Sequence, residues 1–455
     1  MMELPIAFKE RMQTQLGTDF PAFLEALEET APASIHLHPE KRNAEYEDFP
    51  KVLWHTELGR YLTERPVFTL DPSFHAGTYY VQEASSMFLA HIYKNVFKNN
   101  APKRVLDMCA APGGKSTLIA SLLDSNALLL SNEVIQSRFQ ILNQNLTKWG
   151  LPNTQSSNHD PEDFKGLEGF FDFIVVDAPC SGEGLFRKDE NASDEWSEEN
   201  VNICAGRQKR ILAATIPLLA ENGILVYSTC TYNDQENQEN CKWIKSEFGL
   251  EEVAILIDGL DGIEAKECGF QFYPNKVKGE GFFCAVFIQK SEVVSNLSLP
   301  KKPTFKNLLP LPKAQVETMP EWIEGADQFE YFITKNEIVK AIPKNLVPDL
   351  LLIDSILKKK NFGLDLGTFK GKNFIPDHAL ALSVVKSKAI PKVELQLEEA
   401  LIFLKKEIPN KNWEGKGWHL ATYKNEAIGY GKSIPGRANN YLPTNWRIKM
   451  HLSRD

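Results

Sequence analysis

The stretch RVLDMCAAPGGKST, residues 104–117, determines the expected fold class. Its apolar beginning is typical of a buried strand, its small residues predict a tight turn, and a helical pattern starts at Gly114. Gly113 and Gly114 allow a ligand to approach the backbone closely, and the helix N-terminus offers free N–H groups and the positive end of a dipole. A turn of this kind at the carboxyl end of the first strand is where doubly wound sheets bind nucleotides.

Three interpretations of this turn compete. The sequence GKS suggests a P-loop, but the P-loop motif requires glycine at position 109, where Cys109 stands. The dinucleotide-binding motif GxGxxG is also absent from the turn. A purely structural turn is the third interpretation, although Pro112 followed by two glycines and Lys115 is unusually specific for one.

Outward from the turn, short apolar runs alternate with helical stretches as far as residue 290. The predicted strands are 104–108, 127–131, 171–176, 223–228 and 281–288, with a weaker one at 155–159. The predicted helices between them are 114–123, 135–149, 201–219 and 234–248. This alternation predicts an α/β domain with a parallel sheet and helices on both faces.

Composition and charge restrict the class of protein. The chain has 455 residues, 43% of them hydrophobic and 24% charged, with a net charge of −9. These values are typical of a soluble globular protein and exclude a disordered or collagenous chain. No apolar run approaches the roughly 20 residues of a membrane span. Because charges stand where a signal peptide needs an apolar run, we expect a cytoplasmic protein without membrane contact.

The seven cysteines predict neither a zinc site nor a disulfide framework. No two are closer than 11 residues, so no Cys-x-x-Cys pair exists, and their number is odd. The histidines at 36, 38 and 75 do not have metal-ligand spacing either, so no metal is expected. We expect reduced thiols, with those at 204, 241, 268 and 284 serving as core or helix-face residues.

The last 55 residues are basic, with 10 Lys+Arg against 4 Asp+Glu. Aromatic residues alternate with these cations at Trp413, Trp418, Tyr423, Tyr430, Tyr441 and Trp446. Cations bind phosphates and aromatic faces stack on bases, so this composition is typical of an RNA-binding module. The alternative is a small β domain whose aromatic residues form its core.

Four ordered motifs resemble the RNA 5-methylcytosine methyltransferases of the Sun/Nop family. They are LDMCAAPGGK at 106–115, GTYYVQEASSM at 77–87, DAPCSGEG at 177–184 and YSTCTY at 227–232. With GWHLATY at 417–423 and GRANNY at 436–441, the chain is most similar to the bacterial branch, type F, that acts on the small ribosomal subunit. The resemblance implies a Rossmann-like core that uses S-adenosylmethionine, an N-terminal α/β extension and a C-terminal PUA-like RNA-binding region.

The implied organisation has five segments. An N-terminal accessory domain that binds RNA covers 1–75, and the methyltransferase domain covers 76–290. A linker rich in proline and lysine follows at 291–312, then a middle domain at 313–395 and the basic PUA-like domain at 396–455. The expected partner is 16S ribosomal RNA within the small ribosomal subunit, with the protein acting as a monomer.

The resemblance also assigns the cofactor residues. The loop residues are Cys109, Ala110, Ala111, Pro112, Gly113, Gly114 and Lys115. Glu133 ends the second predicted strand, where a carboxylate faces the cofactor ribose. Asp160 matches the family residue near the adenine, and Asp177 ends the next strand beside the methyl donor. For Cys109, a small packed side chain is a sufficient explanation.

Methylation of cytosine at carbon 5 requires an activated ring, because this carbon is a poor nucleophile. A thiolate that attacks carbon 6 creates an enamine-like adduct whose carbon 5 can accept a methyl group. Cys180 and Cys230 both end predicted strands, so both should open onto the same edge of the sheet. DNA cytosine methyltransferases use a Pro-Cys nucleophile, which would nominate Cys180. The RNA family instead implies that Cys230 attacks and that Cys180 assists product release.

The remaining roles follow from the same resemblance. Asp177 would contact the cytosine edge and assist its protonation, with Lys115 as a second polar contact. The family has Arg-x-Asn near Ser34, where this chain has His36 and His38, so contacts from this strand to RNA or cofactor are in doubt. The segment 186–188 reads either as a mobile substrate loop or as a solvated one.

Two rival functions stay open on the sequence alone. One is a transfer-RNA cytosine-5 methyltransferase, which would use the same chemistry on another RNA. The other is a catalytically silent RNA-binding assembly factor that retains the fold, although both cysteines, Asp177 and the full cofactor loop argue against loss of activity.

Overall fold

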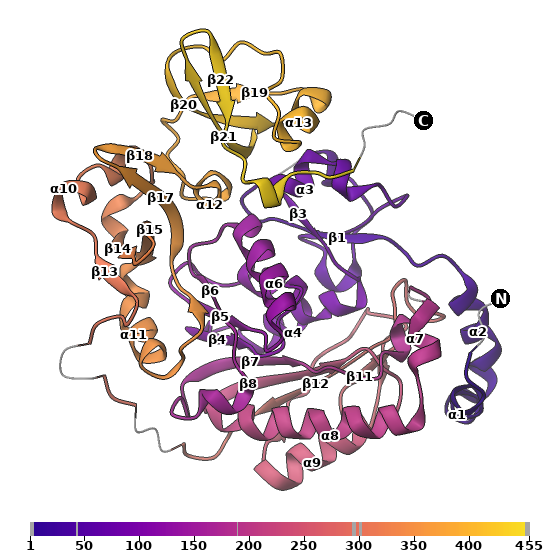
Figure 1. Ribbon diagram of the computed structural model, residues 1–455. Helices are drawn as coiled ribbons and strands as arrows, with labels where there is room; N and C mark the ends of the chain where they lie inside the picture. Colours follow the sequence, from indigo (N-terminus) through magenta and orange to yellow (C-terminus); the bar gives the residue numbers. More distant parts are fainter. Residues whose placement is uncertain (1–3, 42–43, 189, 294–296, 300–302, 451–455) are drawn as a thin grey trace.

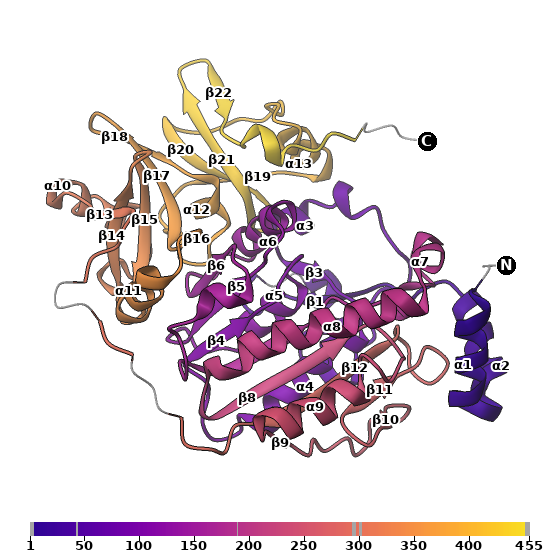
Figure 2. The same cartoon turned by 60° about the horizontal axis from the view of Figure 1, so that its bottom comes forward.

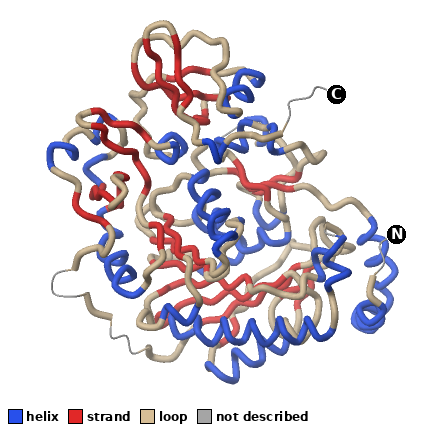
Figure 3. Tube along the Cα trace, viewed as in Figure 1, coloured by secondary structure: helices blue, strands red, loops and turns tan. Residues whose placement is uncertain are grey.

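The computed structural model describes residues 4–41, 44–188, 190–293, 297–299 and 303–450 (Figure 1). Strands gather into four separate sheets, one in each successive region of the chain (Figure 3). The largest sheet has the order β10-β11-β12-β8-β7-β4-β5-β6-β16, with β9 paired to β12. In the described part of the chain, no helix combines the length and the apolar character needed to cross a membrane.

The centre of the large sheet is parallel, as predicted. Its five parallel strands are β4 (Arg104–Asp107), β5 (Leu128–Asn132), β6 (Thr154–Ser157), β7 (Phe171–Asp177) and β8 (Leu219–Thr229). The helices between them are α5 (Gly114–Ala120), α6 (Gln136–Trp149), α7 (Glu190–Glu195), α8 (Glu198–Thr215) and, after β8, α9 (Gln238–Phe248). The predicted helices therefore form, with ends shifted by a few residues.

The predicted parallel arrangement holds for the centre of the sheet but not for its edges. The strand expected at 281–288 is β12 (Phe282–Ile288), and it runs antiparallel to β8. The chain reaches β12 from β8 through α9 and then through β9 (Glu251–Glu252), β10 (Glu264–Ala265) and β11 (Phe270–Phe272). β11 and β12 are joined by a short connection and pair antiparallel, as such strands do.

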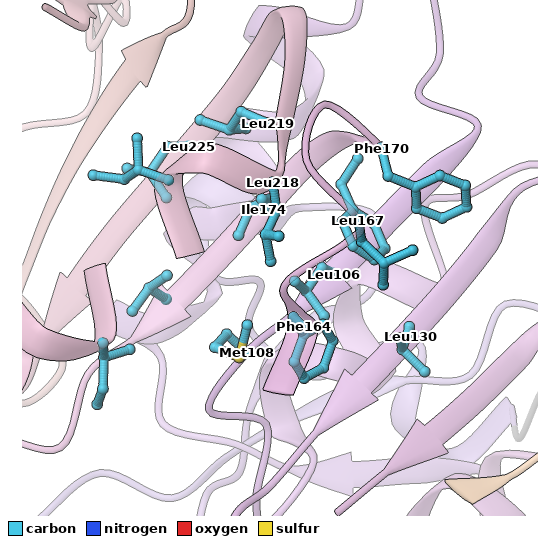
Figure 4. Close-up of a cluster of buried hydrophobic side chains, with 14 of the residues drawn as sticks. Leu106, Met108, Leu130, Phe164, Leu167, Phe170, Ile174, Leu218, Leu219 and Leu225 are labelled. Atoms are coloured by element: carbon cyan, nitrogen blue, oxygen red, sulfur yellow. The ribbon is translucent and has the colours of Figure 1, made fainter. Parts of the chain in front are cut away.

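Alternate residues of the central strands enter two different hydrophobic clusters, one on each face of the sheet. Leu106 and Ile174 pack beneath α8 and α9 with Met108, Phe164 and Leu225 (Figure 4). Their neighbours Val105 and Val175 pack on the other face, against α4 (Phe88–Val96) and α5. Figure 2 shows α8 and α9 lying across one face of the large sheet, next to β8. This double burial explains the continuously apolar strands of the sequence.

The N-terminal region carries two helices and a small sheet. The helices are α1 (Ile6–Leu16) and α2 (Phe20–Glu28). The sheet has the order β2-β1-β3, with β1 (Ser34–Leu37), β2 (Gly59–Tyr61) and β3 (Tyr79–Val81), and α3 (Pro72–Ala76) precedes β3.

The region after the linker forms a five-stranded antiparallel sheet, where the sequence gives only mixed signals. Its strands are β13 (Leu308–Pro310), β14 (Phe329–Thr334), β15 (Ile338–Pro343), β17 (Leu364–Lys370) and β18 (Asn373–Pro376). Its helices are α10 (Lys313–Val316), α11 (Val347–Ile356) and α12 (His378–Leu382). The short strand β16 (Lys360–Asn361) leaves this region and pairs with β6, which extends the large sheet.

The C-terminal region is a four-stranded sheet with one helix. Its elements are β19 (Lys392–Glu394), α13 (Leu397–Leu404), β20 (Gly417–Tyr423), β21 (Glu426–Ile434) and β22 (Arg437–Asn440). Trp413 and Tyr430 are buried in its core, whereas Tyr441 is 37% exposed. Trp418, Tyr423 and Trp446 are half-buried. The aromatic residues therefore divide between a small core and the surface of this region.

Candidate functional site

The two cysteines at strand ends meet at one edge of the large sheet. Cys180 follows β7 and Cys230 follows β8, and their Sγ atoms lie 2.9 Å apart in a thiol–thiol hydrogen bond. The backbone N–H of Cys230 also donates to Sγ of Cys180 over 3.3 Å. Adjacent parallel strands bring their carboxyl ends together, which accounts for the pairing. The remaining described cysteines at 204, 241, 268 and 284 are buried, as expected of core residues.

The pKa of Cys180 is raised well above that of a free thiol. The largest cause is its hydrogen bond with Cys230, and burial and the nearby charge of Glu236 act in the same direction. Cys180 therefore keeps its proton at neutral pH. Because the thiolate is the nucleophilic form of cysteine, this environment disfavours Cys180 as the attacking group.

Asp177 and Lys115 form an ion pair beside the thiols. Asp177 ends β7, and its Oδ2 lies 2.7 Å from Nζ of Lys115, while Oδ1 accepts a hydrogen bond from the Ser228 hydroxyl. Burial alone would lower the pKa of Lys115, but the charge of Asp177 and their hydrogen bond raise it. The Asp177 side chain remains 36% exposed. A charged donor and an accessible acceptor thus stand at the same edge.

Behind the thiols, Glu236 connects three elements. Its carboxylate accepts hydrogen bonds from the Ser181 N–H at 3.0 Å, the Gln208 amide at 2.6 Å and the Asn233 amide at 2.7 Å. These donors come from the loop after β7, from α8 and from the loop after β8. Burial raises the pKa of Glu236 although the hydrogen bonds oppose the shift. The sequence analysis missed this residue.

Glu183, in the loop after β7, connects the sheet edge that carries the two thiols to the N-terminal helix α1. Its Oε1 accepts from the Trp196 indole at 2.9 Å and lies 2.7 Å from the guanidinium of Arg11 on α1. Its Oε2 accepts from the backbone N–H of Tyr232 at 3.0 Å. Glu183 is buried and lies inside the DAPCSGEG motif, which was the only signal for it in the sequence.

Within residues 186–188, the side chains of Phe186 and Arg187 are buried, whereas Lys188 is exposed. The Phe186 ring packs against Phe8 with centroids 5.0 Å apart. Arg187 makes an ion pair with Glu280 at 2.9 Å, and both side chains are less than 5% exposed. A buried ion pair with further hydrogen bonds holds its geometry, because breaking it would leave a buried charge unpaired.

A cavity of about 360 Å³ lies beside the cofactor loop. Cys109, Glu133 and Arg138 line it from one side, and Pro179 and Ile211 from the other. Burial raises the pKa of the Cys109 thiol, which fits a packed, unreactive side chain. The cavity therefore joins the end of β5 to the loop that carries Cys180.

The cofactor loop has the close geometry that its glycines suggested. Ala110 and Ala111 are buried, a cis peptide bond precedes Pro112, and Gly113 has φ of 116°. This positive φ is one that L side chains rarely adopt, so glycine is favoured at this position. Gly114 and Lys115 begin α5, whose N-terminus faces the sheet edge.

Glu133 and Asp160, two of the carboxylates predicted to bind the cofactor, have different surroundings. Glu133 is buried and lines the cavity; its Oε1 accepts from the N–H of Ile135 at 2.8 Å. Asp160 does not line the cavity, although its neighbours Pro161 and Arg210 do. It is bound by Arg210 at 2.9 Å, and this hydrogen bond lowers the pKa of Asp160.

Asp107 was not singled out by the sequence analysis, although it lies in the cofactor loop. It is fully buried; its Oδ2 accepts from the Ser116 hydroxyl at 2.6 Å, while Oδ1 has no partner. Burial raises the pKa of Asp107 to about 7. An unsatisfied buried carboxyl oxygen is costly, and it points to a missing donor at this end of the loop.

The two histidines that replace the family's Arg-x-Asn pack inward. His36 stacks on Tyr80 with centroids 5.6 Å apart, and His38 contacts the backbone oxygen of Trp149 at 2.9 Å. Burial lowers the pKa of both rings, so both are neutral. Across the described residues, no group of three or more His, Cys, Asp or Glu side chains is placed to hold a metal ion.

Three family models match successive parts of the chain. Residues 4–84 match the N-terminal domain of 16S rRNA methyltransferase RsmF, residues 95–288 match 16S rRNA methyltransferase RsmB/F, and residues 390–448 match the methyltransferase RsmF PUA domain.

Curated relatives cover most of the chain. A ribosomal RNA small subunit methyltransferase F from Vibrio cholerae is 32% identical over 384 residues, or 81% of this chain and 79% of that protein. The protein of the same name from Photobacterium profundum is 32% identical over 381 residues, with 81% and 78% covered.

Solved structures share the fold. A methyltransferase homolog protein from Pyrococcus horikoshii has a TM-score of 0.54 at 25% identity and covers 63% of this chain and 96% of its own. NSun6 from Pyrococcus horikoshii, solved with SFG, has a TM-score of 0.52 at 20% identity and covers 63% and 99%.

Proposed function

Because this chain belongs to the RsmF family of 16S ribosomal RNA methyltransferases, we propose that it methylates carbon 5 of cytosine in 16S ribosomal RNA. The methyl donor is S-adenosylmethionine, and the reaction passes through a covalent bond between Cys230 and the cytosine. The observation that carries the proposal is the pair of thiols 2.9 Å apart beside the Asp177–Lys115 ion pair. This combination supplies a nucleophile, a second thiol and a proton source at one edge of the sheet.

The residues around the cavity fit the proposed cofactor. Glu133 would accept hydrogen bonds from the ribose hydroxyls, and the partnerless Oδ1 of Asp107 would accept one from the cofactor's ammonium. Residues 109–115 would surround the methionine part, and Asp160 would lie toward the adenine end with Arg210. When bound, S-adenosylmethionine supplies the electrophilic methyl group that the activated carbon 5 accepts. The SFG in the NSun6 structure supports cofactor binding in this fold.

In the first step, Sγ of Cys230 loses its proton and forms a bond to carbon 6 of the cytosine, the double bond moves from C5–C6 to C4–C5, and N3 gains a proton, so the net proton transfer is from the thiol to N3. Asp177 contacts the N3 edge and assists its protonation, with Lys115 at 2.7 Å as the second polar group. The positive charge of Lys115 and the hydrogen bond at N3 stabilise the negative charge that develops on the ring. Carbon 5 is thereby made nucleophilic.

Release of the product breaks the bond between Cys230 and carbon 6. Carbon 5 loses its proton to solvent, the double bond between carbons 5 and 6 re-forms, and the C6–S electron pair returns to Cys230. Cys180 keeps its own proton and lies within hydrogen-bond distance of Cys230, so it stabilises the departing sulfur. Cys180 therefore assists elimination and does not attack.

The substrate assignment rests on relatives and on the C-terminal region. The curated relatives are named ribosomal RNA small subunit methyltransferases, and residues 390–448 match the RsmF PUA domain. We place the chain in the cytoplasm as a monomer acting on RNA of the small ribosomal subunit. The alternative within the same chemistry is transfer RNA.

Bisulfite sequencing of ribosomal and transfer RNA, with and without the gene, tests the assignment. We expect at least one 16S cytosine that resists conversion only when the gene is present. A gene-dependent cytosine in transfer RNA alone would favour the alternative substrate. RNA binding by the purified chain without any gene-dependent cytosine would instead favour the silent assembly factor.

A further inference from the structure

A cleft of about 700 Å³ separates α6 from the C-terminal half of the chain. The α6 wall presents uncharged polar side chains, including Gln140, Asn143, Gln144 and Thr147. In the described part of the chain, the side chains of Gln140 and Gln144 form no hydrogen bond. Amide groups both donate and accept, so this wall suits base edges and sugar hydroxyls better than phosphates.

The opposite wall combines an aromatic ring with a buried imidazole. Trp446 follows the C-terminal sheet, and its ring lies edge-on to His378 with centroids 4.6 Å apart. His378 is 6% exposed, and its Nδ1 has no partner. Burial lowers the pKa of His378 to about 3, so the ring is neutral. The half-buried Trp446 supplies an aromatic surface of the kind on which bases stack.

Two carboxylates also line the cleft, and both are engaged. Asp377 accepts from the N–H of Ala379 at 2.8 Å, and Asp365 lies 2.5 Å from Nζ of Lys340. Negative groups disfavour phosphate within the cleft itself. Arg447 and Lys449, one and three residues after Trp446, are exposed cations that could contact phosphates of a strand leaving this wall.

The cleft adjoins the proposed cofactor cavity at the first turn of α6. Ser137 lines the cleft, and its neighbour Arg138 lines the cavity. From Arg138 to Thr147 the helix rises about 14 Å at about 1.5 Å per residue. The cleft therefore extends away from the site over a distance that a few nucleotides of single-stranded RNA would span.

From these features we infer that the cleft binds an unpaired nucleotide of the RNA strand that flanks the target cytosine. Trp446 stacks on its base, Gln140 and Gln144 bind its base edge or ribose, and Arg447 contacts the adjoining phosphate. This inference rests on the proposed function and adds to it a second nucleotide site, formed jointly by the methyltransferase domain and the C-terminal half.

The test measures binding of full-length 16S ribosomal RNA transcript and the steady-state kinetics of its methylation. For Trp446→Ala we expect about a tenfold weaker affinity and a similarly raised KM, because stacking on an aromatic ring contributes this much. Trp446→Phe should retain most of the affinity. The affinity for S-adenosylmethionine should stay unchanged in both variants.

A second variant avoids any effect on folding. Gln140 and Gln144 lie on the solvent side of α6, and alanine favours helix, so the double change Gln140→Ala/Gln144→Ala should fold normally. We expect its KM for RNA to rise about fivefold through lost hydrogen bonds. The matched control for Trp446→Ala is Trp243→Ala, a half-buried tryptophan on α9, and both views place α9 across the molecule from α12 (Figures 1 and 2).

Unchanged RNA affinity and KM in both cleft variants would overturn the inference. A parallel loss of S-adenosylmethionine affinity would also overturn it, since the cleft would then belong to the cofactor site. Failure of the wild type to methylate any RNA would refute the proposed function. RNA affinity would still report on the cleft in that case, so the two failures are distinguishable.

Discussion

The sheet edge behind the thiols and the cofactor loop beside them differ in how they satisfy buried carboxylates. Glu236 and Glu183 each accept hydrogen bonds from several elements, so the edge that carries Cys180 and Cys230 is complete within the chain. Asp107, by contrast, retains an oxygen without a partner. The thiols are thus held in place in advance, whereas we propose that a ligand supplies the missing partner at the cofactor loop.

The largest expected effect separates the two thiols at the complete edge. Cys230→Ser should abolish methylation and leave no RNA adduct that survives denaturation, since the attacking sulfur is gone. Cys180→Ser should still attack and transfer the methyl group, but its release should be slow, so a covalent protein–RNA band should accumulate. Denaturing gels with RNA and S-adenosylmethionine measure both. The reverse pattern of bands would make Cys180 the nucleophile.

The next largest effect concerns Glu236, whose carboxylate accepts hydrogen bonds from three elements behind the thiols. Glu236→Gln replaces an acceptor by an amide whose NH₂ group must face the donors from Gln208 or Asn233. We expect a loss of about 3 kcal/mol in the free energy of unfolding, because buried donors lose their partner. Urea denaturation measures it. The exposed Glu239→Gln on α9 is the control and should stay within about 0.5 kcal/mol of wild type.

On the cofactor side, Glu133→Ala should weaken S-adenosylmethionine binding by about 2 kcal/mol, through loss of hydrogen bonds to the ribose. Its effect on stability should be small compared with that of Glu236→Gln, since among the described residues the Glu133 carboxylate accepts one hydrogen bond, from the Ile135 N–H, and makes a longer ion pair with Arg138 at 3.6 Å. Calorimetry measures the affinity, with the exposed Glu162→Ala as control. If ATP bound in place of S-adenosylmethionine, the methyltransferase assignment would fail.

The smallest effect is a pH dependence. The pKa of Asp107 is about 7 in the folded chain, above its ordinary 3.8, so this carboxyl lowers stability progressively between about pH 4 and pH 7. A ligand ammonium favours the ionised form, so S-adenosylmethionine affinity should rise about fivefold from pH 6 to pH 7 and level off above about pH 8. Titration calorimetry at several pH values tests this. Asp107→Asn should remove the slope; a slope that persists would assign it to another group.

The difference between local sequence patterns and contacts across the chain explains which features could be predicted from the sequence. The strands around residues 104–117 and the helices between them have long periodic patterns, and the carboxyl ends of parallel strands are where Cys180 and Cys230 had to meet. The direction of β12 was not predictable, because an apolar strand reads the same in either direction. Glu236 was missed because an acid among Asn and Ser residues resembles a solvated loop until its three donors are seen in space. The buried ion pair of Arg187 was not predictable for the same reason, since its partner Glu280 lies far along the chain.

The pairing of β16 with β6 has a consequence for how this protein can be divided. Ser156 and Ser157 of β6 pair with Asn361 and Lys360, so two residues from beyond the linker cover the outer edge of the methyltransferase sheet. A fragment cut after residue 290 would expose that edge, and open edges of this kind recruit strands from neighbouring molecules. A fragment of the catalytic domain alone would therefore be prone to self-association.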